Sequence, residues 1–176
     1  MRHFAFALLA FAVSLASCGV GLPSYRDPDV TIASSANFDA SRYLGRWYEI
    51  ARYPNSFQAN CAGAIAEFSA GEGEILVRNI CLDEAGMPLS EIAGTATDQG
   101  LGRLSVQLGG VRATEPYWVL WVDEGYRTAV VGSPNGQVGW ILNRDPEIPE
   151  DRLTAAREVL DFNGYDLSQL ERSVTP

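Results

Sequence analysis

The chain of 176 residues has no lysine, and its one histidine is His3. All 13 basic residues are therefore arginines. No histidine or lysine follows position 3. This excludes histidine-dependent nucleophilic catalysis, histidine-ligated metals, a Schiff-base lysine and a phosphate-loop lysine from the rest of the chain. The sequence thus predicts no enzymatic activity of these kinds, no cofactor and no metal ion.

Basic charge is scarce as well. The 22 acidic residues outnumber the basic ones and give a formal net charge of -9. Nucleic acids require a basic face, so we expect no nucleic-acid partner. Attraction to an anionic membrane surface is excluded for the same reason. Hydrophobic residues make up 47%, which is enough for the core of a single domain of this length.

A long hydrophobic run is also absent, because the apolar stretch Phe4–Val13 is shorter than the ~20 residues that span a bilayer. This stretch follows Arg2 and precedes small residues, which is typical of a secretory signal. The segment Leu15-Ala16-Ser17-Cys18 resembles the bacterial lipobox. We therefore predict a lipoprotein signal peptide over residues 1–17 and a lipidated Cys18. The alternative is an ordinary signal peptide with a cysteine nearby by chance.

Gly19 stands where an aspartate would favour retention at the inner membrane, so we expect the lipid anchor to lie in the outer membrane, facing the periplasm. Small and polar residues predominate from Gly19 to Ala36. We interpret residues 18–36 as the lipidated cysteine followed by a flexible tether, and residues 37–176 as the folded domain.

Eight short apolar runs recur at near-regular spacing between turn signals rich in glycine, aspartate and asparagine. The runs are Trp47–Ala51, Ala64–Phe68, Ile75–Ile80, Ile92–Thr97, Arg103–Leu108, Tyr117–Val122, Tyr126–Val131 and Val138–Leu142. This pattern predicts an all-β barrel or sandwich. Eight is also the number of strands at which a closed barrel can hold one small ligand.

One helix is predicted after the last run. Pro149 and two acidic residues suit its first turn, and Asn163-Gly164 suits its end. Four apolar residues fall on one face of this helix: Leu153, Ala156, Val159 and Leu160. Such a stripe must be buried, and the outer wall of the barrel is the available surface.

Cys61 and Cys81 follow an export signal, which makes an oxidising compartment the expected one. A hairpin that turns near residue 71 would place them within about one residue of facing each other. We therefore predict a disulfide, with two buried thiols as the alternative. Two cysteines without histidine make an incomplete metal site.

Three segments carry a family resemblance. Gly45-Arg46-Trp47-Tyr48-Glu49-Ile50-Ala51-Arg52 resembles the Gly-x-Trp signature of lipocalins, in the form found in bacterial lipocalins and apolipoprotein D. The segments 123–132 and 140–146 resemble the second and third conserved regions of the family. They depart from it at Val122 and Asp145, where threonine is usual.

The resemblance implies an eight-stranded antiparallel up-and-down barrel with a C-terminal α-helix packed on its outside. It is expected to be closed at one end. In that fold Trp47 plugs the closed end and Arg144 stacks across its indole ring. The motif residues are Gly45, Trp47, Asp123, Tyr126 and Arg144.

The cavity lining is predicted from strand alternation and from the resemblance. If Trp47 points inward, so do Glu49 and Ala51. The resemblance favours Trp118 as inward, and Leu120 shares its face. The candidate ligand-binding residues are Glu49, Ala51, Phe57, Phe68, Trp118, Leu120 and Trp140. Glu49 would either orient a polar group of the ligand or be neutralised by an internal arginine.

The resulting functional hypothesis is a lipid-anchored binding protein for a fatty acid or lysophospholipid, with a role in lipid storage, transport or repair. A first alternative is a barrel packed solid whose surface serves for docking. A second is a lipocalin-type enzyme, which would need two carboxylates converging in the cavity. The sequence leaves open whether the protein is a monomer or a homodimer.

Overall fold

The computed structural model describes residues 24–109 and 113–176. The predicted signal peptide and Cys18 therefore lie outside the described residues. Each of the eight predicted runs overlaps one strand of the structure. The strands are β1 (Gly45–Arg52), β2 (Gly63–Ala70), β3 (Ile75–Leu82), β4 (Pro88–Asp98), β5 (Arg103–Leu108), β6 (Glu115–Val122), β7 (Thr128–Gly132), β8 (Gly139–Asn143) and a short β9 (Glu171–Arg172).

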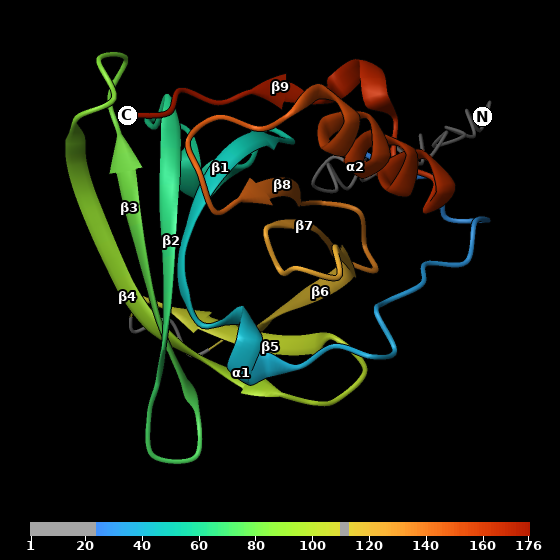
Figure 1. Cartoon of the computed structure of the whole chain (residues 1–176), viewed down its shortest axis with the longest axis horizontal. Coiled ribbons are helices and arrows are strands. Elements are labelled where there is room, and N and C mark those ends of the chain that lie inside the picture. The colour runs from blue at the N-terminus through green and yellow to red at the C-terminus, as the bar shows by residue number, and fades with distance from the viewer. Residues whose placement is uncertain (1–23, 110–112) are drawn as a thin grey trace, which may run out of the picture.

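The strands form one antiparallel sheet in the order β2-β3-β4-β5-β6-β7-β8-β1-β9, and β1 also pairs with β2. This second pairing of β1 closes the eight long strands into a barrel (Figure 1). The up-and-down barrel predicted from the sequence is confirmed. The helical elements are α1 (Ala40–Tyr43), η1 (Ser56–Gln58), α2 (Glu150–Phe162) and η2 (Leu167–Gln169). In the described part of the chain, neither α-helix has the length and apolar character needed to cross a membrane.

Trp47 closes one end of the barrel. Its side chain is fully buried, and the Arg144 guanidinium lies 3.8 Å from the centre of its ring. Arg144 also donates hydrogen bonds to the backbone carbonyls of Leu44 (2.8 Å) and Arg46 (2.9 Å). Gly45 has φ +101°, and a Cβ there would meet the Arg144 side chain at 3.1 Å, so glycine is required. The predicted Trp47–Arg144 stack is confirmed.

The turn between β6 and β7 lies at the same end. The Asp123 carboxylate accepts hydrogen bonds from the backbone amides of Arg127 (2.5 Å) and Thr128 (2.6 Å). Burial acts to raise the pKa of Asp123, but these bonds and the Arg127 charge outweigh it and hold the pKa below its usual value. Tyr126 adopts φ 54° within this turn, which is why β7 starts at Thr128 and not at Tyr126 as predicted.

Helix α2 packs on the outer wall, as predicted. Ala156 and Leu160 are fully buried and join Val130 of β7 and Ile141 of β8 in one apolar cluster. This cluster lies outside the barrel and is separate from the interior cluster around Trp47.

Residues 24–38, here called the N-terminal strap, run along the barrel wall. Backbone amides of the strap donate to carbonyls of the barrel and of the α2 end: Tyr25 to Gly136, Asp27 to Gly164 and Ser35 to Val119, each at 2.8 Å. The predicted flexible tether is therefore wrong for residues 24–36. Small and polar residues are typical of flexible linkers, but here the backbone finds its hydrogen-bond partners on the barrel.

The Cys61–Cys81 disulfide is confirmed, with a Cα–Cα distance of 5.2 Å. The register used to predict it is wrong, however, because Cys81 faces Ala64 and not Cys61. Cys61 precedes β2, and Gly63 starts that strand opposite Leu82. The disulfide thus ties the loop before β2 to the end of β3.

Candidate functional site: a cavity inside the barrel

A cavity of about 690 Å³ occupies the barrel between the Trp47 end and the opposite, open end, which we call the mouth. Its apolar lining comes from strands all around the barrel: Ala64, Ala66, Phe68, Val77, Val106, Leu108, Tyr117, Trp140 and Leu142. Polar lining residues include Glu49, Arg52, Asn55, Gln58, Asn79, Asn135 and Gln137. Four of the seven predicted residues therefore line the cavity: Glu49, Phe57, Phe68 and Trp140.

Trp118 and Leu120 do not line the cavity, and their prediction is corrected. Tyr117 of β6 lies opposite Leu104 of β5 and faces the interior, which places Trp118 on the outer face. There Trp118 packs under the Arg103 guanidinium, 4.3 Å from its ring, and Leu120 joins the α2 cluster. Family resemblance had favoured the wrong face of β6.

The prediction that Ala51 lines the cavity is also wrong. The pairing of β1 with β8 shifts register between Glu49 and Ala51, where Glu49 faces Leu142 and Ala51 faces Ile141. A bulge of this kind adds one residue to the strand and reverses the facing of everything after it. Ala51 therefore packs in the outer cluster with Ile141, and Arg52 takes the inward position.

Tyr117 is a lining residue that the sequence analysis missed. Its ring lies 6.0 Å from that of Phe68 and 5.9 Å from that of Trp140. Its hydroxyl shares a 2.8 Å hydrogen bond with that of Tyr43. Burial raises the pKa of both tyrosines, so both hydroxyls stay protonated and this part of the cavity is uncharged.

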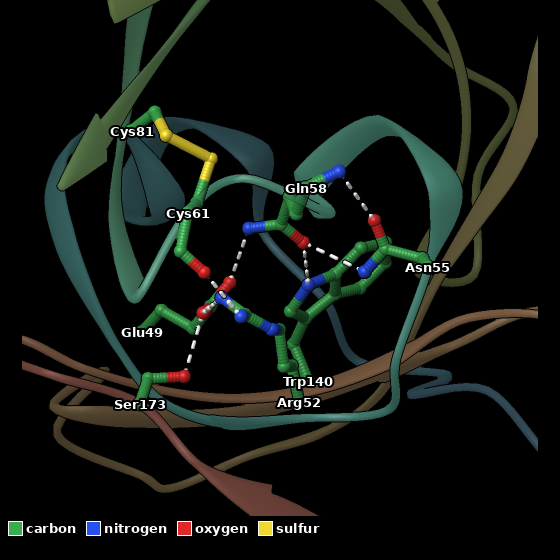
Figure 2. The surroundings of a disulfide bond; sticks show 8 residues. All are labelled: Glu49, Arg52, Asn55, Gln58, Cys61, Cys81, Trp140 and Ser173. Carbon is green, nitrogen blue, oxygen red and sulfur yellow. Dashed lines mark hydrogen bonds and ion pairs between the residues drawn. A yellow bond between two sulfur atoms is a disulfide. The ribbon is translucent and has the colours of Figure 1, made fainter. Parts of the chain in front are cut away.

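Glu49 is the centre of a polar cluster near the mouth (Figure 2). Its carboxylate accepts hydrogen bonds from Arg52 Nη1 (2.9 Å), Gln58 Nε2 (2.6 Å) and Ser173 Oγ (2.6 Å). The Glu49 and Arg52 side chains are only 4% and 13% exposed. Of the two predicted alternatives for Glu49, the structure shows neutralisation by an internal arginine.

The same cluster holds the loop between β1 and β2 in place. Gln58 Oε1 accepts hydrogen bonds from Trp140 Nε1 (3.0 Å) and Asn55 Nδ2 (2.8 Å). Arg52 Nη2 donates to the carbonyl oxygen of Cys61, next to the disulfide (Figure 2). The loop therefore forms a fixed rim of the mouth. Its Phe57 side chain is 49% exposed and lies 6.0 Å, ring to ring, from Trp140.

Charge on the described lining is acidic. Arg52 and Glu49 neutralise each other, which leaves the exposed carboxylates of Glu115 and Glu171 as the other charged groups of the described lining. In residues 24–109 and 113–176 no three or more His, Cys, Asp or Glu side chains lie close enough together to hold a metal ion.

A closed eight-stranded barrel with one largely apolar cavity defines a class of proteins that hold a small hydrophobic ligand inside. The chain belongs to the lipocalin family, since the model of the lipocalin-like domain matches residues 38–175. Members of this family are generally binding and transport proteins and not enzymes.

Relatives agree with this assignment. The chain is 34% identical to apolipoprotein D of Mus musculus over 145 residues, which cover 76% of this chain and 75% of the relative. It is 30% identical to temperature-induced lipocalin-1 of Arabidopsis thaliana, with 77% and 78% covered. Among solved structures, insecticyanin from the tobacco hornworm Manduca sexta has the same fold, with a TM-score of 0.68, 19% identity and 88% of each chain covered.

Proposed function

We propose that this protein is a lipid-anchored lipocalin that binds one fatty acid or lysophospholipid and serves lipid storage, transport or repair at the bacterial outer membrane. The observation that carries the proposal is the cavity of about 690 Å³, which is apolar at depth and polar at its mouth. A ligand that fits this gradient is an amphiphile with an acyl chain and a polar head.

Burial of the acyl chain supplies most of the affinity. Phe68, Val77 and Leu142 offer an apolar surface deep in the barrel, and each Å² of apolar surface removed from water contributes about 25 cal/mol before the entropic losses of binding. Amide side chains at the mouth, such as Asn135 and Gln137, are placed to orient the head group.

The acidic mouth favours one head group over another. Glu115 and Glu171 repel the carboxylate of a free fatty acid but attract the ammonium group of a zwitterionic lysophospholipid. We therefore expect a lysophospholipid to bind more tightly than a fatty acid of equal chain length. A barrel packed solid, the first alternative function, is disfavoured by the volume of the cavity.

The test is a tryptophan-fluorescence titration of the chain starting after Cys18, with lysophospholipids and fatty acids of graded chain length. Trp140 is the reporter, because it lines the cavity whereas Trp47 is sealed at the closed end. We expect a saturable change that grows with chain length and then levels off. Trp140→Phe should lose most of this signal. A flat response for every chain length would reject lipid binding.

Anchoring rests on the segment Leu15-Ala16-Ser17-Cys18. Stable attachment needs more than one acyl chain, and the lipoprotein modification supplies three. The test is the mass of the N-terminal peptide after expression of the full chain in a bacterium that processes lipoproteins. Cys18→Ser should abolish both the acyl mass and flotation with membranes.

A further inference from the structure

The N-terminal strap starts at the mouth of the barrel. Tyr25 lines the cavity, its hydroxyl donates to the carbonyl oxygen of Pro54 at 2.7 Å, and its amide donates to that of Gly136 in the β7–β8 turn. The strap then descends the wall, and the Asp39 amide just beyond it donates to the Tyr126 hydroxyl at the closed end, at 2.7 Å. Ser24, where the described part of the chain begins, therefore lies at the mouth of the barrel, against Gly136.

Little chain separates this point from the predicted anchor. Cys18 and Ser24 are six residues apart, which allows at most about 20 Å at full extension. The eight residues of β1 rise about 27 Å along the strand, or about 20 Å along the axis of a barrel with the usual strand tilt. To bring the closed end to a membrane, the anchor segment would have to extend fully along the whole wall.

Apolar side chains at the mouth are exposed to water. Phe57 on the rim loop is 49% exposed, Met87 in the β3–β4 turn 61%, and Leu89 at the start of β4 57%. Figure 1 shows the β3–β4 turn projecting at the end of the barrel where β9 lies, opposite α1. Large exposed apolar groups of this kind gain free energy when they enter a lipid interface.

We infer that the mouth of the barrel faces the phospholipid bilayer that carries the Cys18 anchor, with Phe57, Met87 and Leu89 in contact with its surface. This inference rests on the anchoring in the proposed function. It adds the orientation of the barrel relative to the bilayer. In this orientation a lipid passes between the bilayer and the cavity beside Phe57 without crossing bulk water. The contact is apolar, because the carboxylates of the described lining, Glu115 and Glu171, oppose attraction to anionic lipid.

Two single-cysteine labels test the orientation in the full lipidated chain. Met87→Cys places a thiol at the mouth, and Leu101→Cys places one in the β4–β5 turn, where the native side chain is comparably exposed at 56%. With Cys18 acylated and Cys61 and Cys81 oxidised, the introduced thiol is the one available for an environment-sensitive fluorophore. Each protein is reconstituted into zwitterionic vesicles containing lipids with a spin label at the head group.

The expected result is flotation of both proteins, with at least twofold stronger quenching of the label at position 87 than at position 101. The variant Phe57→Asp/Leu89→Asp should reduce that difference while flotation persists. Equal quenching, or stronger quenching at position 101, would overturn the inference and leave the anchor standing. Failure to float would reject the anchor and the inference together. A blue shift at position 87 that follows protein concentration and not lipid would assign the apolar mouth to a second copy of the chain instead.

Discussion

Removal of the Glu49 carboxylate should destabilise the protein before it changes what the protein binds. Three donors converge on this buried group, from Arg52, Gln58 and Ser173. Breaking a buried ion pair by removing one partner costs about 3–5 kcal/mol, since the other charge stays buried without its partner. We therefore expect Glu49→Ala to lower the free energy of unfolding by about 3–4 kcal/mol, close to a 2 M fall in the urea midpoint.

The substitution Glu49→Gln removes the charge of the side chain but keeps its shape, so it separates the two contributions to stability. The amide keeps one acceptor oxygen for Arg52, but its NH₂ group meets the NH₂ of Gln58, whose oxygen is already used by Trp140. A loss of about 2 kcal/mol follows, the value of one hydrogen bond to a charged group. The matched control is Glu171→Gln, an exposed lining carboxylate, which should shift stability by less than about 0.5 kcal/mol.

A double-mutant cycle completes the test. Because Arg52 and Glu49 satisfy each other, Glu49→Ala and Arg52→Ala together should cost at least about 1 kcal/mol less than the sum of the single changes. Urea unfolding at pH 7 and the fluorescence titration are measured on every variant. The reasoning is refuted if Glu49→Ala weakens lipid binding tenfold but leaves the unfolding free energy within 1 kcal/mol of wild type (about the error of the comparison).

Three further predictions concern the closed end of the barrel and its cavity. Arg144→Ala should lower the free energy of unfolding in urea by about 3 kcal/mol, because the stack on Trp47 is lost and backbone carbonyls are left without donors. A decrease below about 1 kcal/mol would contradict this prediction. Asp123 has a lowered pKa in the folded state, so the stability it contributes above about pH 4 is lost as the pH falls through its folded pKa. The variant Asp123→Asn should therefore have a lower free energy of unfolding than wild type at pH 7, and that free energy should fall less between pH 5 and pH 3. An equal fall in both proteins over this pH range would count against the prediction. Ala66→Trp should fill the cavity and weaken lipid binding at least tenfold while the protein stays folded, whereas Leu76→Trp on the outer face should leave binding unchanged.

Local signals were sufficient for the architecture. Turn residues such as Gly71-Glu72-Gly73 and Pro134-Asn135-Gly136 act over a few positions, so the number and order of the eight long strands could be predicted without tertiary information, whereas the short β9 was missed. The apolar face of α2 is an equally local signal, since the spacing of its apolar residues predicts a helix with one face that must be covered by an apolar surface. Trp47 and Arg144 were identified through family resemblance, and the structure confirms their stack.

Barrel closure decided which side chains of a strand point into the barrel and which point outward. The sequence of β1 alternates regularly through Ala51, but the register of β1 against β8 inserts a bulge after Glu49. The same happens on β6, where the pairing with β7 shifts between Val119 and Trp121. A bulge depends on how a strand must fit its neighbours when the barrel closes, and the alternating sequence gives no signal of it. The sequence of β6 therefore left both of its faces equally possible, and only the structure shows that Tyr117 points inward in place of Trp118.

The sequence by itself thus determined which segments become strands and helix and which residues close the barrel, because these depend on short-range patterns and on motifs. Only the tertiary structure decided which side chains line the cavity, that Glu49 is held by Arg52, Gln58 and Ser173, and that residues 24–38 bind the wall. The strap contacts and the Ser173 bond to Glu49 join positions distant in the chain. Arg52 is close to Glu49 in sequence, but it points inward only because β1 shifts register against the distant strand β8 when the barrel closes.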